Sequence, residues 1–437
     1  MGFEDRLRRI RGQAPVPAAV PPFSHGVPQP IGPTFAERLN RLSVGRARPS
    51  QTPAPPPDEM ALAATLGAEV LTPGVLLLER RLDARYRHGR VLLGAPHEPR
   101  YLSWTHANPV DPASPVDRIG WISEAHPPDS PPKTSWLCLD TETSGLSGGT
   151  GTWVFLTGLL RAEGAGWRLR QYLLTRLDAE SVYLERVAAD LAPPERLLTY
   201  NGRTFDAPLL ATRFRLTGRP DPRAALPHLD LLTPTRRAFA RHWPDCRLAT
   251  AESRLLGVQR TDDLPGAEAP AAWLGWLRRG ETGALAAVLR HNRDDLLSLA
   301  GLLPVLDAVY QDPAVYGADC RGVAAAHQSH GDQALALRIL AANRRALDAT
   351  GLHDLARLYR RAADWPAAIG IWEELSACGD PAARAALARY HEHRGGDLAR
   401  ALALAEALPP GEARERRCQR LRTRLSHSAK TAPVRGK

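Results

Sequence analysis

The sequence predicts an α/β domain, with a mixed sheet flanked by helices, followed by an all-α domain of helical repeats. Two observations carry this prediction. Between residues 136 and 309 strand-like and helix-like runs alternate, which is typical of an α/β layer architecture. After residue 312 alanine-rich helical patterns replace the strands. A chain of 437 residues is also too long for one average core, so two to three domains are expected.

The first 58 residues are rich in proline and poor in aromatic residues. Such a segment cannot bury enough apolar surface to offset its ordering entropy, so we predict disorder, apart from a short helix at TFAERLNRLS. Residues 59–130 carry short apolar runs, such as GVLLLERRL and GRVLLG, that glycine and proline interrupt. These runs favour strands, in a separate β-rich segment or in an extension of the next domain. The proline-rich stretch EAHPPDSPPKTS indicates a linker or an exposed loop.

The α/β domain is expected over residues 131–312. Its predicted strands are WLCLDTE, WVFLTGLL, WRLRQYLL and RLLTYN. Its predicted helices are AESVYLERVAADL, FDAPLLATRFRL and GALAAVLRHNRDDLLSLAGLLPVL.

The helical domain is expected over residues 313–412. Asp332, Asp364 and Asp397 each precede an alanine-rich helix as a potential N-cap, and they recur after 32 and 33 residues. This spacing predicts about three stacked helix pairs and is close to the tetratricopeptide period of about 34 residues. The remaining residues, 413–437, form a basic tail that we expect to fray.

The charge balance points to an anionic partner. The formal net charge is +10, and all but three of the 57 basic residues are arginine. The planar guanidinium suits phosphate, although a genome rich in G and C also favours arginine codons. Five dispersed cysteines form no zinc pattern and no disulfide framework. No apolar run of membrane-spanning length and no signal-peptide core occurs, so we predict a cytoplasmic protein without membrane contact.

Two acidic residues follow the apolar run in the stretch LCLDTETSGLSGGTGTWVFLTGLL. Alternate side chains of a strand share a face, so Asp140 and Glu142 are expected to project together at the end of a buried strand. Two anions held this close repel each other unless a cation lies between them, and hard oxygen ligands favour Mg²⁺ or Mn²⁺. The alternative is an exposed turn with two unrelated acids, because D-x-E is a common pattern.

Two further segments place acids in a similar setting. In RLLTYNGRTFDAPLL an apolar run ends in a polar turn that opens a helix, which makes Asp206 either a site residue or an N-cap. In LRHNRDDLLSLAGLL, His291 and Asp295 are four residues apart and share one helix face, whereas Asp294 points elsewhere. The alternative for this segment is a surface helix with a polar side.

Taken together, a D-x-E pair, an Asp after N-x-x-x-F and an Asp four residues after a His resemble the three exonuclease motifs of the DEDD superfamily, which has the ribonuclease H fold. DTETSGLSGGTGTWVFLTGL, TYNGRTFDAPLL, VLRHNRDDLLSLAGL and the intervening segment from HLDLL to DDLPG are most similar to its YprB-type family of RNase H-like exonucleases. The resemblance covers about residues 135–303. Helical repeats after the nuclease domain also look like that family.

This resemblance implies that Asp140, Glu142, Asp206 and Asp295 are catalytic carboxylates that bind two divalent ions, Mg²⁺ or Mn²⁺. Such ions activate the attacking water and hold the leaving 3′ oxygen of a phosphodiester. The resemblance also implies that His291 orients or deprotonates the water, and a reference pKa of about 6.5 suits that task. The His-to-Asp spacing lacks one residue found in the histidine-containing proofreading subclass, so the role of His291 is implied less firmly.

Thr143, Asn201 and Arg203 lie beside the first two motifs and are predicted to contact nucleic acid, although Asn201 can equally close its own turn. We predict that Asp230, in HLDLL, is structural or supports a ligand rather than binding metal itself.

Two other segments have two interpretations each. The arginines of TPTRRAFARHW, with Phe239 and Trp243 between them, either line a groove for a single strand or form the wet face of an amphipathic helix. The SGGTG segment lacks the patterns of nucleotide-binding loops, so a tight glycine turn is favoured over a cofactor site.

The resulting prediction is a metal-dependent 3′–5′ exonuclease that hydrolyses single-stranded DNA or RNA, with the repeats recruiting a protein partner or extending the substrate path. The alternative is a nucleic-acid-binding scaffold with little or no turnover that acts through its helical repeats. Endonuclease action on branched DNA is an intermediate possibility.

Overall fold

The structure is a computed structural model, and it describes residues 57–94, 99–102, 136–145, 150–164, 166–191, 196–260, 264 and 266–431. The predicted disordered N-terminal segment, with its short helix, therefore lies outside the described residues apart from its last two positions. The proline-rich stretch EAHPPDSPPKTS and most of the SGGTG segment also lie outside them.

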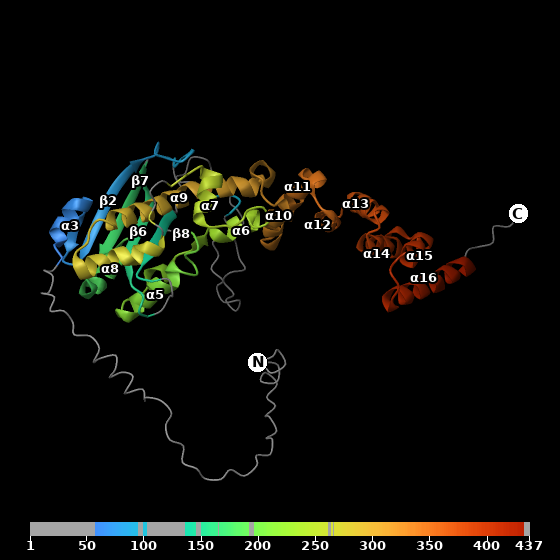
Figure 1. Ribbon diagram of the computed structural model, residues 1–437. Coiled ribbons are helices and arrows are strands. Elements are labelled where there is room, and N and C mark those ends of the chain that lie inside the picture. The colour runs from blue at the N-terminus through green and yellow to red at the C-terminus, as the bar shows by residue number, and fades with distance from the viewer. Residues whose placement is uncertain are drawn as a thin grey trace, which may run out of the picture. The chain divides into compact units, whose positions relative to one another are not determined.

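The α/β domain is built on a seven-stranded sheet with the strand order β1-β2-β7-β6-β5-β8-β9 (Figure 1). The strands are β1 (Glu69–Thr72), β2 (Val75–Asp83), β5 (Trp136–Thr143), β6 (Val154–Glu163), β7 (Gly166–Leu174), β8 (Arg196–Thr199) and β9 (His228–Asp230). The first five of these in sheet order pair antiparallel, and β5, β8 and β9 run parallel. All four strands predicted for this domain are present.

Helices connect and cover these strands. They are α4 (Glu180–Ala189), α5 (Asp206–Leu216), α6 (Leu232–Phe239), α7 (Leu248–Ala251), α8 (Ala269–Arg279) and α9 (Leu285–Gln311). The parallel neighbours β5 and β8 need a crossover connection between them. The chain passes through β6 and β7 and then returns to β8 through α4. The prediction missed α8, which contains Pro270 and Gly275, but its Trp273 and Trp276 are buried and donate to backbone carbonyls of Leu174 and Thr175.

Residues 59–94 add two strands to the main sheet and one small hairpin. β2 pairs with β7 from Val75 opposite Leu174 to Asp83 opposite Gly166. The hairpin consists of β3 (Arg87–His88) and β4 (Val91–Leu92). The expectation of strands is wrong at the start of this stretch, where α3 (Glu59–Leu66) is a helix. Asp58 caps this helix, and Gly67 ends it with φ of 65°, a conformation that glycine adopts without strain.

The C-terminal third consists of paired helices, α10 (Cys320–Ser329) with α11 (Gln333–Ala342), α12 (Ala349–Arg361) with α13 (Trp365–Ala377), and α14 (Pro381–Tyr390) with α15 (Leu398–Glu406). The three predicted caps are confirmed, because Asp332, Asp364 and Asp397 each accept the backbone N–H three residues later. The first helix of each pair begins in the same way, at Asp319, Asp348 and Asp380. An aspartate at every start satisfies N–H groups that a helix leaves unpaired.

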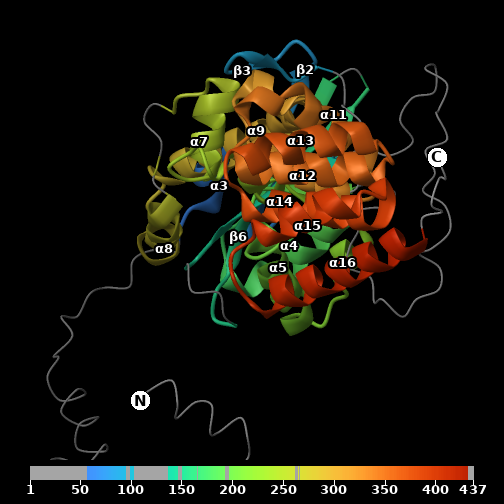
Figure 2. The same cartoon turned by 90° about the vertical axis from the view of Figure 1, so that its right-hand side faces the viewer.

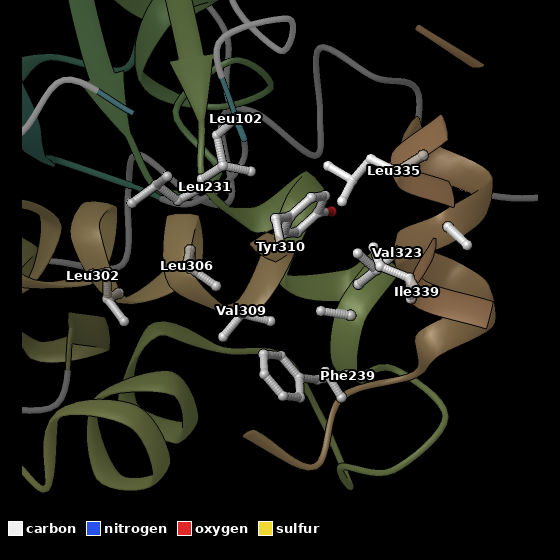
Figure 3. Close-up of a cluster of buried hydrophobic side chains, with 14 of the residues drawn as sticks. Leu102, Leu231, Phe239, Leu302, Leu306, Val309, Tyr310, Val323, Leu335 and Ile339 are labelled. Atoms are coloured by element: carbon white, nitrogen blue, oxygen red, sulfur yellow. The ribbon is translucent and has the colours of Figure 1, made fainter. Parts of the chain in front are cut away.

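The α/β domain and the first helix pair share one hydrophobic core (Figure 3). The second half of α9 contributes Leu306, Val309 and Tyr310 to it. These side chains pack with Phe239 of α6 and with Val323 of α10. Burial of these large apolar side chains stabilises the contact, because removing each one from water contributes about 2 kcal/mol.

The expected frayed tail begins as a helix, α16 (Glu412–Thr431), which packs against α15 (Figure 2). Cys418 and Leu421 are buried against it. Three arginines of α16, Arg417, Arg420 and Arg424, reach the buried carboxylate of Glu392. Periodic apolar positions and this ion-pair cluster explain why the basic segment is ordered. Within the described residues, no helix combines the length and apolarity needed to cross a membrane.

Candidate active site

The first two predicted site residues lie in the last half of β5. The strand begins with four buried residues, from Trp136 to Leu139, and its polar end follows. Asp140 lies opposite Gly158 of β6, and Glu142 lies opposite Leu156. Because the two acids are two residues apart, they share one face of the strand. A shift of register follows Glu142, so the regular pairing ends at the site.

Asp206 is attached to the same strand by a hydrogen bond. It is the first residue of α5, where the helix N-terminus favours negative charge. The hydroxyl of Thr141, which lies between Asp140 and Glu142, donates to its carboxylate. Asp206 is therefore held at β5 and is not the side-chain cap of its own helix, since Phe205 occupies the cap position.

His291 and Asp295 lie one turn apart on α9, with Nε2 of the histidine 3.8 Å from Oδ2 of the aspartate. Asp294 points elsewhere, as predicted, and pairs with Arg293. The carboxylate of Asp295 accepts from Arg260, whose guanidinium also donates to Nδ1 of His291 over 3.0 Å. The structure thus brings an arginine into the pocket that the sequence did not single out.

The charges of the other three carboxylates act on Asp140. Burial raises the pKa of Asp140 well above its usual range, and the charges of Asp295, Asp206 and Glu142 raise it further. Burial also raises the pKa of Asp206 to about 6 and raises that of Asp295, against the opposing effect of Arg260. Acids from three distant segments therefore gather where their charges repel.

The donor set fits a hard divalent cation, although the side chains are turned to other partners. Among the residues that the structure describes, no three acidic, histidine or cysteine side chains converge closely enough to enclose a metal ion as they stand. Asp140 accepts from Asn292, Asp206 from Thr141 and Asp295 from Arg260. Carboxylate oxygens are the ligands that Mg²⁺ and Mn²⁺ prefer, and a cation would offset the negative charges that raise the pKa of Asp140. The carboxylates must turn away from these partners for an ion to bind.

Asn292 links Asp140 to the interior of the domain. Its side-chain amide donates to both the carboxylate and the backbone carbonyl of Asp140, over 2.8 and 3.2 Å. Its own carbonyl accepts from Gln171 of β7, which also donates to the backbone of Leu289. Both amide side chains are buried. A buried polar network with every partner satisfied holds its members in one arrangement.

The turn after β8 is organised by Asp230. Its carboxylate accepts the backbone N–H groups of Asn201, Arg203 and Leu232, which makes its role structural, in line with the sequence prediction. Asn201 has φ of 65°, and its side chain accepts from the hydroxyl of Thr204, so it closes its own turn.

The other two residues predicted to contact nucleic acid also lie near the site. Arg203 is exposed, and its guanidinium donates to the backbone carbonyl of His228. Thr143, at the end of β5, donates to the backbone carbonyl of Gly145.

The predicted single-strand groove at TPTRRAFARHW is wrong for Phe239, which is fully buried and stacks on Trp243 at 3.9 Å between ring centroids. The amphipathic alternative is correct for this segment. In α6, Arg236 and Arg237 are exposed, whereas Ala238 and Phe239 enter the core. The apolar residues recur at helical spacing because they form the face of α6 that packs into the core.

Sequence reasoning missed Asn292 and Arg260. Asn292 had a weak signal, because a buried face of a helix seldom carries an amide without a partner. No local sequence signal marked Arg260, because it follows a turn whose side chains meet α9 only after folding.

Known proteins resemble this chain in the region just described. The sequence profile of the RNase_H superfamily matches residues 137–306. The uncharacterized protein YprB of Bacillus subtilis (strain 168) is 31% identical over 288 residues, which are 63% of this chain and 69% of YprB.

Solved structures of Escherichia coli exonuclease I are more distant. The complex with a dT13 oligonucleotide is 18% identical, with a TM-score of 0.24, over 34% of this chain and 42% of that one. The complex with a dA16 oligonucleotide is 17% identical, with a TM-score of 0.26, over 44% of this chain and 50% of that one.

Proposed function

The chain belongs to the RNase H superfamily, in the family of YprB, and from this premise we propose that it is a metal-dependent nuclease. More specifically, we propose a 3′–5′ exonuclease that hydrolyses single-stranded DNA or RNA with two divalent ions, Mg²⁺ or Mn²⁺. The observation that carries the proposal is that Glu142, Asp206 and Asp295 lie close enough to the buried Asp140 for their negative charges to raise the pKa of its carboxyl. A fold does not maintain such repulsion in a buried pocket for stability, so a positively charged ligand is its simplest explanation.

These four carboxylates would hold the ions, which when bound activate water and stabilise charge on the phosphate and the leaving oxygen. Other residues of the chain orient these carboxylates. Asn292 orients Asp140, and Thr141 orients Asp206. These hydrogen bonds fix the positions of the two carboxylates at the site.

Substrate contacts are proposed around the same edge of the sheet. Phe205 precedes Asp206 and exposes 60% of its surface, which is unusual for a phenylalanine. An exposed ring beside a phosphate-cleaving site suits stacking on a nucleobase, a contact that any base can make. Asn201 and Arg203 lie in the turn that precedes it, and Thr143 ends β5. The exposed guanidinium of Arg203 suits a backbone phosphate.

The test uses the purified full chain and single strands of DNA and RNA labelled at the 5′ or 3′ end. We expect shortening from the 3′ end with Mg²⁺ or Mn²⁺ and none with EDTA. Asp140→Asn should lower the rate by at least about 100-fold, whereas Asp178→Asn, at an exposed aspartate paired with its neighbour Arg176, should leave it unchanged. Equal rates for wild type and Asp140→Asn would overturn the proposal.

A blocked 3′ end separates exonuclease from endonuclease action. An exonuclease of the proposed polarity stops at the block, whereas an endonuclease cuts internally and still releases fragments. Branched DNA should be tested beside the single strands for that reason.

One observation favours the alternative, a nucleic-acid-binding scaffold with little or no turnover. Arg260 already neutralises Asp295, which reduces the charge available to a cation. If binding of single strands persists without any cleavage under all metal conditions, the scaffold is correct. A protein partner for the helical repeats would then carry the function.

A further inference from the structure

A buried chain of hydrogen bonds leads from the β3–β4 hairpin to the candidate active site. It begins at His88 of the hairpin, whose Nε2 lies 2.7 Å from the hydroxyl of Ser298 on α9. Ser298 donates its single hydroxyl hydrogen to Glu252 over 2.5 Å. Because that hydrogen is used, His88 must be the donor to Ser298. All three side chains are buried, and only 1% of Glu252 is exposed.

Glu252 binds Arg260 through two hydrogen bonds. Nε and Nη2 of the guanidinium donate to the two carboxylate oxygens over 3.0 and 2.5 Å. This fork-to-fork geometry fixes the plane of the guanidinium as well as its position. The carboxylate belongs to a single π-helical turn, Glu252–Leu256, and such turns are frequent at functional sites.

Arg260, held in this plane, contacts two site residues at once. Nη2 donates to Asp295, and Nη1 lies 3.0 Å from Nδ1 of His291. Arginine has only donors, so Nδ1 of His291 must accept. A neutral imidazole has one lone pair, which this contact uses, and its hydrogen is therefore on Nε2.

We propose that Glu252 and Arg260 are a positioning pair that holds His291 as the Nε2–H tautomer and fixes its ring against Asp295. His291 then presents a hydrogen-bond donor, suited to a phosphate oxygen, rather than a lone pair that removes a proton from water. The role in catalysis rests on the proposed nuclease function, but the tautomer does not. Neither Glu252 nor Arg260 needs to touch the substrate for this role.

The direct test is the ¹⁵N spectrum of the histidines in the full-length, metal-free chain at pH 8. His291→Gln identifies the His291 signals. We expect Nε2 protonated and Nδ1 unprotonated in the wild type, with the Nδ1 signal shifted by its hydrogen bond. Arg260→Met removes the donor at nearly equal length, so the hydrogen-bond shift should disappear and the Nδ1–H tautomer should become populated.

Two further variants keep this test decisive if Arg260→Met folds poorly. Arg260→Lys retains a donor-only cation and should restore the wild-type tautomer. Glu252→Gln should weaken the same signal by loosening the guanidinium. The matched control is Arg254→Met, which removes an exposed arginine of the same turn that lies over Trp243, and it should leave the His291 signals unchanged.

Activity provides the second measurement. With His291 mispositioned, we expect kcat of Arg260→Met to fall about 10- to 100-fold with KM nearly unchanged, and Arg260→Lys to recover part of the loss. A wild-type chain without cleavage would refute the nuclease proposal, yet the spectra would still decide the positioning pair. A protonated Nδ1 in the wild type, or identical His291 signals in wild type and Arg260→Met, would refute the pair itself.

Discussion

The side-chain amide of Asn292 donates to the carboxylate of Asp140 across the boundary between α9 and the sheet. The contact is possible because Asp140 faces Gly158 on the neighbouring strand. A methyl group on Gly158 would lie 2.2 Å from Oδ1 of Asn292. One glycine, one amide and one carboxylate therefore form a single packing unit at the centre of the site.

Removing the amide should disorder Asp140 without unfolding the protein. Asn292→Leu retains most of the volume but leaves the carboxylate without its donor, so we expect affinity for Mn²⁺ and the cleavage rate to fall about 10- to 100-fold. Calorimetric titration with Mn²⁺ measures the affinity. The matched control is Asn343→Leu, whose amide donates to the carbonyl one turn earlier in its own helix. Unaltered Mn²⁺ affinity in Asn292→Leu would show that the hydrogen bond does not position the ligand.

Filling the space at Gly158 should separate α9 from the sheet. Gly158→Ala drives a methyl group into Asn292 and Leu296, and overpacking of this kind costs about 2 kcal/mol. Urea denaturation of this variant measures the loss. Gly151→Ala is the control, because a methyl group there meets nothing within 4 Å. Equal midpoints for wild type and Gly158→Ala would mean that the helix adjusts freely.

Neutralising Asp206 should stabilise the metal-free protein while abolishing its activity. The folded pKa, about 6, exceeds the ordinary value of 3.8, so the folded state binds this proton more tightly than the unfolded chain. The resulting stability is present below pH 4 and is lost as the pH rises through 6. At pH 8 the charged carboxylate is therefore a net cost, and Asp206→Asn should gain about 1 to 2 kcal/mol after allowance for partial exposure.

Melting temperatures at two pH values check this expectation. The gain of Asp206→Asn should be present at pH 8 and vanish at pH 4, where the wild-type carboxyl is already protonated. Mn²⁺ should raise the melting temperature of the wild type much more than that of the variant, because the ion binds the folded state. A loss of stability at pH 8 would contradict the raised pKa of the buried Asp206 carboxyl.

Mild acid should weaken the fold through His228. Burial, and next the charge of Arg203, lower the pKa of this histidine to about 4, below its ordinary value of 6.5. The unfolded chain therefore takes up the proton first, and stability falls as the pH drops from 6.5 towards 4. Between pH 7.5 and pH 5 the free energy of unfolding of the wild type should fall by about 2 kcal/mol more than that of His228→Gln. Urea denaturation measures this difference, and the same comparison with His242→Gln, at an exposed histidine, is the control.

The buried carboxylate of Glu392 should hold α16 in place. Arg420 donates to both of its carboxylate oxygens, over 2.9 and 3.1 Å, and Arg417 and Arg424 form longer ion pairs with it. Glu392→Gln leaves these cations uncompensated, at a cost of about 2 kcal/mol. Hydrogen exchange should then quicken in α16 and stay unchanged in α5. Glu406→Gln, at an exposed carboxylate paired with Arg422, is the control and should have little effect.

Much of the fold was predictable because its signals are local. Apolar runs of strand length identified β5, β6, β7 and β8, and an aspartate before each alanine-rich helix identified the repeats. Alternation along a strand was enough to place Asp140 and Glu142 on one face. The helix α3 lies in the stretch that was predicted to be rich in strands, because eight residues contain too little periodicity to identify a helix.

The sequence by itself determined the elements, the caps and the acidic positions, since each depends on residues a few places apart. Only the tertiary structure decided that Arg260 lies between Glu252 and His291, and that Asn292 reaches Asp140 across 152 positions of the chain. These contacts arise when α9 packs on the sheet, and burial then makes each donor and acceptor find a partner. These hydrogen bonds depend on how the helices and strands pack together, and a local pattern of residues does not contain that information.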